Sequence, residues 1–206
     1  MSITIHDCEQ GTEEWYRARM GMPTASEFST VMAKGRGGEE SKTRRTYMLK
    51  LAGELITGEP MENYSNGYME RGKIMEAEAR SYYTFMNDKI EVKQVGFISD
   101  GRRCGCSPDA LLGDEGVLEI KTAAPHILAD LILRDQFPPE HMAQCQGALF
   151  VTDREWLDLL VYWPKFPMFC KRITRDASYI GNLENEIDRF NREMADLVSK
   201  VESYGK

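Results

Sequence analysis

The sequence predicts an α/β protein in which helices come first and a mixed β-sheet follows. Helix start and stop signals recur through residues 12–58, and an apolar stripe at three- and four-residue steps follows over residues 75–86, which is the helical period. Alternating and short apolar runs, typical of strands, dominate from residue 90, and a polar amphipathic tail closes the chain. The 206 residues are 42% hydrophobic, which suffices for one well-filled core. We therefore expect one domain, residues 1–206, with a helical N-terminal part.

The first expected element is a short helix that begins at Thr12 and ends before Gly21. Thr12 is a suitable N-cap, and the acidic residues after it complement the positive end of the helix dipole. The spacing from Thr24 to Glu27 fits a capping box, in which each side chain bonds the other's backbone N–H. A second short helix is therefore expected to run to about residue 33.

The remaining elements follow in order. Residues 34–42 hold several glycines among charged residues and predict a loop. Helices are expected over residues 43–56, 68–86, 140–151 and 180–204, and strands over residues 90–98, 117–121, 157–163 and 168–174.

Charge and cysteine content narrow the class of protein. The net charge of −7 argues against a protein that coats DNA through bulk charge, but it permits an enzyme that grips DNA locally. Five cysteines without a CxxC pair suit a reducing cytosol. A zinc site can be drawn from Cys104, Cys106, His141 and Cys145, although buried thiols are the better interpretation.

No feature of the sequence predicts a membrane or secreted protein. No apolar run approaches the ~18 residues that a membrane span needs. The N-terminal segment lacks the basic and apolar regions of a signal peptide, so a cytoplasmic location is expected.

Residues 107–121 contain the strongest candidates for a catalytic site. The tripeptide Ser107-Pro108-Asp109 precedes a turn-rich segment, and the strand after it places Glu119 and Lys121 on one face. Asp109 can return to meet them across a hairpin. Two carboxylates beside a lysine form a hard-cation site next to a group that can orient water, as metal-dependent phosphodiester hydrolysis requires. A lone Glu-x-Lys would more simply be the exposed face of an ordinary strand.

Two further polar residues can join this group from helices. Glu76 lies beside Met75 and Ala79 of an apolar stripe, although an exposed helical glutamate is the simpler alternative. Gln144 shares a helical face with Ala148, so we prefer it to its neighbour Gln146 as the inward amide. An inward Gln144 could brace a ligand or the nucleophile, whereas a surface or capping role is the alternative.

Taken together, these motifs resemble a known nuclease family. Asp109, Glu119 and Lys121 reproduce the PD-(D/E)xK nuclease pattern. The blocks Trp15–Glu27, Arg71-Gly72 with Glu76 and Ala79-Arg80, Cys106–Asp109, Leu118–Lys121 and Met142-Ala143-Gln144 occur in the order found in the phage lambda exonuclease family, also called YqaJ-type viral recombinases. His141 departs from that family, which has an aromatic residue before Met-Ala-Gln, and Glu70-Arg71 replaces Ala-Trp.

The resemblance implies a fold and an activity. The fold is a restriction-endonuclease-like core with a central mixed β-sheet flanked by helices. The activity is a 5′-to-3′ exonuclease that degrades one strand of linear double-stranded DNA and leaves 3′ single-stranded overhangs for recombination by strand annealing. Members form toroidal homotrimers and act with a single-strand annealing protein, as phage or prophage products in a bacterial host. The alternatives are a site-specific or structure-specific endonuclease of the same superfamily and a non-catalytic DNA-binding module.

The mechanism expected for such a site uses two Mg²⁺ ions, for which Mn²⁺ should substitute. Asp109, Glu119 and the backbone carbonyl of Ile120 would bind the first ion. Glu76, with Asp109, would support the second. Lys121 would orient the attacking water or stabilise the pentavalent phosphorane.

DNA contacts are expected from two groups of residues. Arg19, Thr24, Ser26 and Ser107 could form a 5′-phosphate pocket, although Thr24 and Ser26 could instead simply cap a helix. The densest basic cluster comprises Lys34, Arg36, Lys42, Arg44, Arg45 and Lys50. Within it, Arg44 and Arg45 are the residues that we expect to contact DNA phosphates, against the alternative of a solvated surface.

Overall fold

The computed structural model describes residues 2–35, 37, 40–61, 67–101 and 103–205, and for residues 67–71 and 73 it describes the backbone only. Arg36, from the basic cluster, lies outside the described residues, as do the side chains of Glu70 and Arg71. None of the described helices is both long enough and apolar enough to cross a lipid bilayer.

Two β-sheets organise the chain. The larger is a five-stranded sheet in the order β2 (Val92–Lys93), β5 (Ala110–Leu112), β6 (Gly116–Thr122), β7 (Trp156–Tyr162) and β8 (Phe169–Thr174). Its β6 and β7 are parallel and its other neighbours antiparallel, so the sheet is mixed, as the sequence predicts. The smaller is an antiparallel three-stranded sheet of β1 (Ile3–His6), β3 (Phe97–Asp100) and β4 (Gly105–Cys106).

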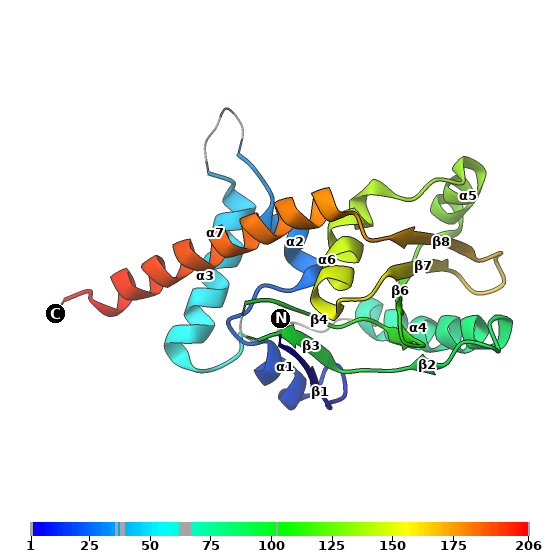
Figure 1. Cartoon of the computed structure of the whole chain (residues 1–206), viewed down its shortest axis with the longest axis horizontal. Helices are drawn as coiled ribbons and strands as arrows, with labels where there is room; N and C mark the ends of the chain where they lie inside the picture. Colours follow the sequence, from blue (N-terminus) through cyan, green and yellow to red (C-terminus); the bar gives the residue numbers. More distant parts are fainter. Residues whose placement is uncertain (1, 36, 38–39, 62–66, 102, 206) are drawn as a thin grey trace.

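The helices pack around these sheets (Figure 1). The N-terminal part holds α1 (Glu13–Arg19), the 3-10 turn η1 (Ala25–Glu27), α2 (Phe28–Val31), α3 (Lys42–Thr57) and α4 (Gly67–Met86). The later helices are α5 (Pro125–Arg134), the 3-10 turn η3 (Pro139–His141), α6 (Met142–Thr152) and α7 (Ala177–Glu202). The C-terminal end of α7 projects away from the rest of the molecule (Figure 1).

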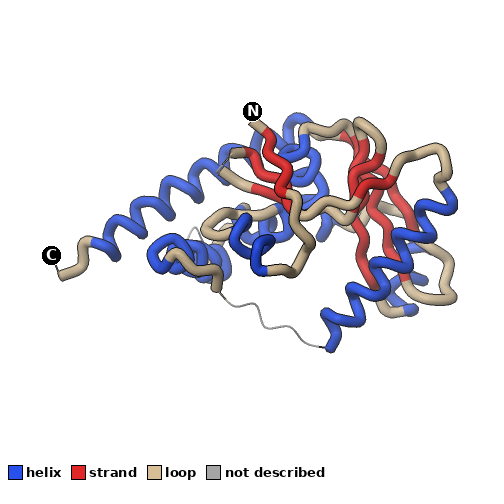
Figure 2. Tube along the Cα trace, turned by 90° about the horizontal axis from the view of Figure 1, so that it is seen from below, coloured by secondary structure: helices blue, strands red, loops and turns tan. Residues whose placement is uncertain are grey.

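The inner strands of the larger sheet are buried on both faces, by α4 on one side and by α6 on the other. Leu118 and Ile120 of β6 pack in a cluster with Ala79 and Tyr83 of α4, which crosses the strands of this sheet (Figure 2). Val117 points to the opposite face and belongs to the larger cluster that contains the buried side of α6. The alternation expected from the period of a strand is therefore present in β6.

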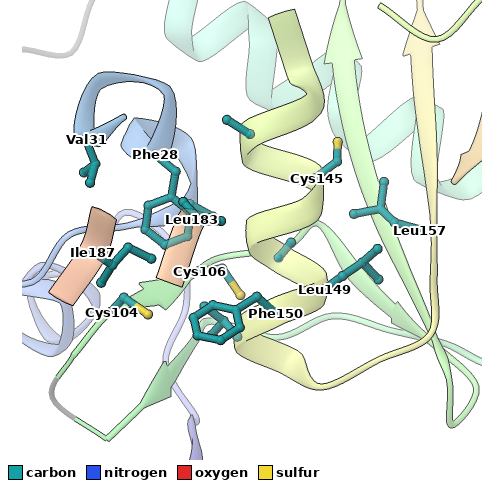
Figure 3. Close-up of a cluster of buried hydrophobic side chains, with 14 of the residues drawn as sticks. Phe28, Val31, Cys104, Cys106, Cys145, Leu149, Phe150, Leu157, Leu183 and Ile187 are labelled. Atoms are coloured by element: carbon teal, nitrogen blue, oxygen red, sulfur yellow. The ribbon is translucent and has the colours of Figure 1, made fainter. Parts of the chain in front are cut away.

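Helix α6 is the centre of the core. Nine of its residues are buried, and the helix is apolar nearly all round, as expected for a helix packed on several sides. Figure 3 shows Cys145 and Leu149 near Leu157 of β7, with Phe28 and Leu183 on the other side of the helix. A helix held this way fixes the position of any polar side chain that it carries.

The structure differs from the expected elements in several places, among them the short strands β4 and β5, which were not expected. The strand expected over residues 90–98 is two strands in different sheets, separated at Gly96, where a Cβ would lie only 1.9 Å from the Cys8 carbonyl oxygen. Strand β1 was not expected, although Ile3-Thr4-Ile5-His6 alternate apolar and polar residues, because four residues are too short a run to identify a strand. Helix α5 was also missed, since Ala124 at its N-cap provides no side-chain hydrogen bond.

Candidate active site

The hairpin of β5 and β6 brings Asp109 beside Ile120. Asp109 immediately precedes β5, and its backbone N–H donates to the Leu118 carbonyl over 3.1 Å. Its carboxylate Oδ2 accepts a hydrogen bond from the Ile120 N–H over 2.6 Å. The Arg80 guanidinium of α4 donates to the Asp109 carbonyl oxygen over 3.3 Å, which ties α4 to the start of the hairpin.

Glu119 lies on the same hairpin and has two side-chain partners. It is 4% exposed, and its Oε1 lies 2.9 Å from Lys121 Nζ. The same oxygen accepts a hydrogen bond from Gln144 Nε2 of α6. Gln146 instead bonds the backbone of Thr174 and Asp176 and is the more deeply buried of the two, so the expectation that Gln144 rather than Gln146 points inward is wrong. Gln144 is nevertheless the amide that reaches the carboxylates.

Charge is unbalanced at the centre of this site. Burial and the neighbouring Glu119 and Glu76 carboxylates raise the pKa of Asp109 well above its ordinary value, although the Ile120 amide and Lys121 act in the opposite direction. Burial alone would lower the pKa of Lys121, but Glu119 and Asp109 outweigh it and raise the pKa overall. Lys121 is therefore an ammonium at neutral pH and acts as a donor and a cation rather than as a base.

The carboxylates have the chemistry that a hard divalent cation requires. Asp109 and Glu119 offer oxygen donors, and a bound cation would neutralise the negative charge that raises the pKa of Asp109. The N–H and C=O of one strand residue point to the same edge, so Ile120 directs its carbonyl toward the side on which Asp109 lies. Glu76, partly buried on α4, is the third carboxylate that acts on Asp109.

Among the described residues, no three His, Cys, Asp or Glu side chains are arranged to hold a metal ion as they lie. Cation binding would therefore depend on Asp109 and Glu119 and would compete with the contacts that Glu119 makes. The zinc site drawn from Cys104, Cys106, His141 and Cys145 is not formed. Those thiols are buried, and burial raises the pKa of each, so the alternative of buried, unreactive thiols is the one that the structure supports.

A second polar cluster lies next to the carboxylates. Arg19, at the end of α1, donates to Ser107 Oγ and to Thr24 Oγ1, each over 3.4 Å, and Thr24 Oγ1 lies 3.3 Å from Ser26 Oγ. A small cavity of about 110 Å³ is lined by these four residues together with Glu119 and Gln144. The structure therefore brings together residues expected to bind a 5′ phosphate and residues expected to catalyse, from segments about 90 residues apart in sequence.

The capping interpretation of Thr24 is wrong. Its side chain makes no capping hydrogen bond, and its backbone N–H donates to the Tyr47 hydroxyl over 3.2 Å. Glu27 is not a capping partner either, because its carboxylate accepts from the Thr30 hydroxyl. The helical elements after Thr24 are very short, so the hydroxyls of Thr24 and Ser26 and the Arg19 guanidinium are the groups available to an anion.

Two residues of this region have roles that the sequence did not assign. The Trp15 indole N–H donates to Ser107 Oγ over 2.9 Å and to the Gly96 carbonyl, and the Arg19 guanidinium lies 3.8 Å from the centre of the Trp15 ring. Gln10 donates to the Pro108 carbonyl over 3.1 Å, which supports the segment before Asp109. The four-residue spacing of Trp15 and Arg19 on one helix was the available signal.

Arg44 and Arg45 do not form a joint DNA-facing pair. The Arg44 side chain is 4% exposed, donates to the Val31 carbonyl and forms an ion pair with Glu193 of α7, so its expected contact with DNA is not supported. It holds α3 against α2 and α7 instead. Arg45 is half-exposed and lies 3.6 Å from Glu40, so it alone of the two can reach a phosphate.

Comparison with known proteins agrees with the resemblance in the sequence. Residues 14–155 match the YqaJ-like viral recombinase domain. No curated protein matches the chain. The fold is similar to the crystal structure of an alkaline exonuclease, LHK-Exo, from Laribacter hongkongensis, with 32% identity, a TM-score of 0.81 and coverage of 93% of this chain and 96% of that one.

Two other solved structures are similar over most of this chain. LHK-Exo in complex with dAMP has 33% identity and a TM-score of 0.82 over 92% of this chain and 96% of that one. A phage-related exonuclease from Haemophilus somnus 129PT has 12% identity and a TM-score of 0.67 over 87% and 96%, which shows a common fold. The fold is thus the α/β, restriction-endonuclease-like arrangement that the sequence predicts. From the domain match and the shared identity, the chain belongs to the YqaJ-like viral recombinase family.

Proposed function

We propose that the protein is a metal-dependent 5′-to-3′ exonuclease that degrades one strand of linear double-stranded DNA. The observation that carries the proposal is the cavity that Arg19, Thr24, Ser26 and Ser107 share with Glu119 and Gln144. It supplies an anion site beside a carboxylate-and-lysine centre, which is what removal of a terminal nucleotide needs. The alkaline exonuclease relatives, one of them crystallised with the deoxynucleoside monophosphate dAMP, support the same activity.

Asp109, Glu119 and the Ile120 carbonyl would hold one Mg²⁺, and Glu76 with Asp109 would support a second. Mn²⁺, which also takes oxygen ligands, would substitute. When bound, the ions lower the pKa of a water and neutralise charge on the phosphate. The raised pKa of Asp109 supports this assignment, because a cation would make the ionised form of that buried carboxyl favourable.

The side chains of this chain supply positioning and charge. The ammonium of Lys121, held 2.9 Å from Glu119, would donate a hydrogen bond to the attacking water or to a non-bridging phosphate oxygen. Gln144 would hold Glu119 from the other side, which fixes the carboxylate relative to the strand. In the reaction, the water oxygen bonds to phosphorus, the bond from phosphorus to the 3′ oxygen breaks, and that oxygen takes up a proton.

Direction would be set by the distance between the two halves of the site. The Arg19 guanidinium and the Thr24 and Ser26 hydroxyls would hold a terminal 5′ phosphate, while Ser107 connects this group to Asp109 through two peptide units. The next phosphate along the strand would then lie at the carboxylates. Cleavage there would release a 5′ mononucleotide and leave a new 5′ phosphate for the next cycle.

The biological setting follows from the family and is part of the proposal. The exonuclease would leave 3′ single-stranded overhangs for recombination by strand annealing, with a single-strand annealing protein as partner. It would act as a toroidal homotrimer, encoded by a phage or prophage, in the cytoplasm of a bacterial host.

The test uses linear duplexes labelled separately at each 5′ and 3′ end, with Mg²⁺ or with a chelator. Early release of the 5′ label, with the 3′ label retained, is expected in Mg²⁺ alone. A closed circular plasmid should remain intact. Cleavage of the plasmid would instead identify a site-specific or structure-specific endonuclease, and absence of any cleavage would indicate a non-catalytic DNA-binding module.

A further inference from the structure

The polar cluster of Arg19, Thr24, Ser26 and Ser107, called the Arg19 cluster below, borders a second and larger cavity. The larger cavity has a volume of about 640 Å³, and Arg19, Thr24 and Ser26 line both this cavity and the small cavity that contains Glu119. These three residues therefore form the boundary between the two spaces. A phosphate held by them would have the carboxylates on one side and the larger cavity on the other.

The larger cavity is lined along one face of α3. Lys42, Thr46, Tyr47 and Lys50 recur there at helical spacing and present ammonium groups, a hydroxyl and an aromatic ring. Tyr16 adds a second aromatic ring from α1. Proteins hold single-stranded nucleic acid by combining aromatic surfaces for the bases with cations for the backbone.

The rest of the lining suits the same kind of ligand. Met22, Leu51 and Met61 supply apolar surface, and a volume of about 640 Å³ falls within the range of roughly 300–1,000 Å³ typical of small-molecule sites. The carboxylates of this cavity already have partners. Glu54 accepts from the Gly21 and Met61 N–H groups over 2.8 and 3.1 Å, and Glu27 accepts from the Thr30 hydroxyl.

The geometry points to a second nucleoside subsite. The larger cavity accepts the terminal nucleoside of a DNA strand whose 5′ end carries a hydroxyl, so that the Arg19 cluster holds the first internucleotide phosphate instead of a terminal one. This inference rests on the proposed function, and it extends the substrate class from 5′-phosphorylated ends to 5′-hydroxyl ends.

The register of the first cut follows. With a terminal phosphate at Arg19, the first product is a mononucleotide. With the strand advanced by one nucleoside, the water oxygen bonds to the next phosphorus, the bond to its 3′ oxygen breaks and that oxygen takes the proton. The first product then contains two nucleosides joined by one phosphate, and the shortened strand carries a 5′ phosphate. All later products are mononucleotides.

The experiment compares two blunt duplexes that differ only in having a phosphate or a hydroxyl at the 5′ end. The second nucleoside of the strand carries a fluorophore on its base, and the size of the first labelled product is measured. A labelled dinucleoside monophosphate from the hydroxyl end and a labelled mononucleotide from the phosphorylated end support the subsite. A labelled mononucleotide from both ends overturns it, as does cleavage of the phosphorylated end alone. Cleavage of neither end refutes the proposed exonuclease function itself.

A cavity-filling variant gives an independent test. Thr46 is an exposed α3 residue on the cavity wall, so Thr46→Trp should occupy the space without disturbing the core. We expect the ratio of the 5′-hydroxyl rate to the 5′-phosphate rate to fall about tenfold or more, in line with the loss of one stacked base. The matched control Ser199→Trp, at an exposed position of α7, should keep the wild-type ratio. An unchanged ratio in Thr46→Trp would overturn the subsite.

Discussion

Asp109→Asn should make the metal-free protein more stable while it abolishes cleavage. Burial and the carboxylates of Glu119 and Glu76 raise the pKa of Asp109, so its ionised form is unfavourable in the folded state. Asparagine removes that charge. Its side-chain oxygen can still accept the hydrogen bond from the Ile120 N–H. The substitution therefore separates the charge of this residue from its structural contact.

The size of the effect follows from charge. Each unit by which the folded-state pKa exceeds the unfolded one costs about 1.4 kcal/mol of stability at neutral pH. Burial and two carboxylates act on Asp109 against the Ile120 amide and one ammonium, Lys121, so a gain on the order of 1 kcal/mol is expected. For a chain of this size, 1 kcal/mol corresponds to a rise in Tm of about 2–4 °C.

The pH dependence has a defined sign. Because the folded pKa of Asp109 is raised, the folded state binds the proton more tightly than the unfolded state. This residue contributes stability at a pH below its unfolded pKa of about 3.9, and that contribution is lost as the pH rises through the folded pKa. The stability advantage of Asp109→Asn should thus be largest at neutral pH and should shrink on acidification.

Mg²⁺ should reverse the order of the two proteins. At a concentration of one hundred times Kd, a bound ion stabilises the wild type by about 2.7 kcal/mol, and the variant should lack this gain. The assay is thermal unfolding with and without Mg²⁺ at several pH values, with Asp114→Asn in the exposed turn of the same hairpin as the control. A metal-free variant less stable than the wild type at pH 7, or equal stabilisation of both by Mg²⁺, would refute the reasoning.

Four further predictions concern single side chains. Lys121→Ala should lower the cleavage rate by at least about 10²-fold with an unchanged circular dichroism spectrum, because a charge directed at the reacting phosphate is lost; wild-type activity would contradict its role. Arg19→Ala should lower the initial rate of cleavage from 5′-phosphorylated ends, because a charge-assisted contact with the terminal phosphate is lost, and a wild-type rate would exclude an anion site there. Arg44→Ala should destabilise by about 1–3 kcal/mol in urea unfolding, because it removes a buried guanidinium that pairs with the half-exposed Glu193 and donates to the Val31 carbonyl. Arg45→Ala should leave stability unchanged and reduce by about 1 the slope of log binding constant against log salt concentration for DNA. A reduced slope in Arg44→Ala with no loss of stability would instead identify Arg44 as the phosphate contact.

The parts of the site that could be predicted from the sequence are those encoded locally. The period of a strand places Glu119 and Lys121 on one face, and the turn before it returns Asp109 to the same end of the hairpin. The period of a helix places Gln144 and Gln146 on different faces, and Gln144 is the one that contacts Glu119, although Gln146 is the more buried. In each case the signal lies within a few residues of the side chain concerned.

The parts that could not be predicted depend on distant partners. Trp15 meets Ser107, and Arg44 meets Glu193, across 92 and 149 residues of sequence, and no local pattern specifies such pairs. The burial of Arg44 results from the packing of α7 over α3. One member of the basic cluster therefore joins helices inside the fold and does not lie on the surface. Likewise, the sequence around Thr24 fits a capping box, but in the structure the Thr24 N–H donates to the Tyr47 hydroxyl and not to the Glu27 side chain.

The size of the first product tests the central claim most directly, namely that the Arg19 cluster holds a 5′ phosphate one nucleotide from the carboxylate centre. A linear duplex carrying a radioactive 5′ phosphate is mixed with the protein and Mg²⁺, and the labelled products are resolved by length within the first turnover. The account predicts that the label appears at once as a mononucleotide. Label released in longer oligonucleotides, or loss of a 3′ label before the 5′ label, would contradict it.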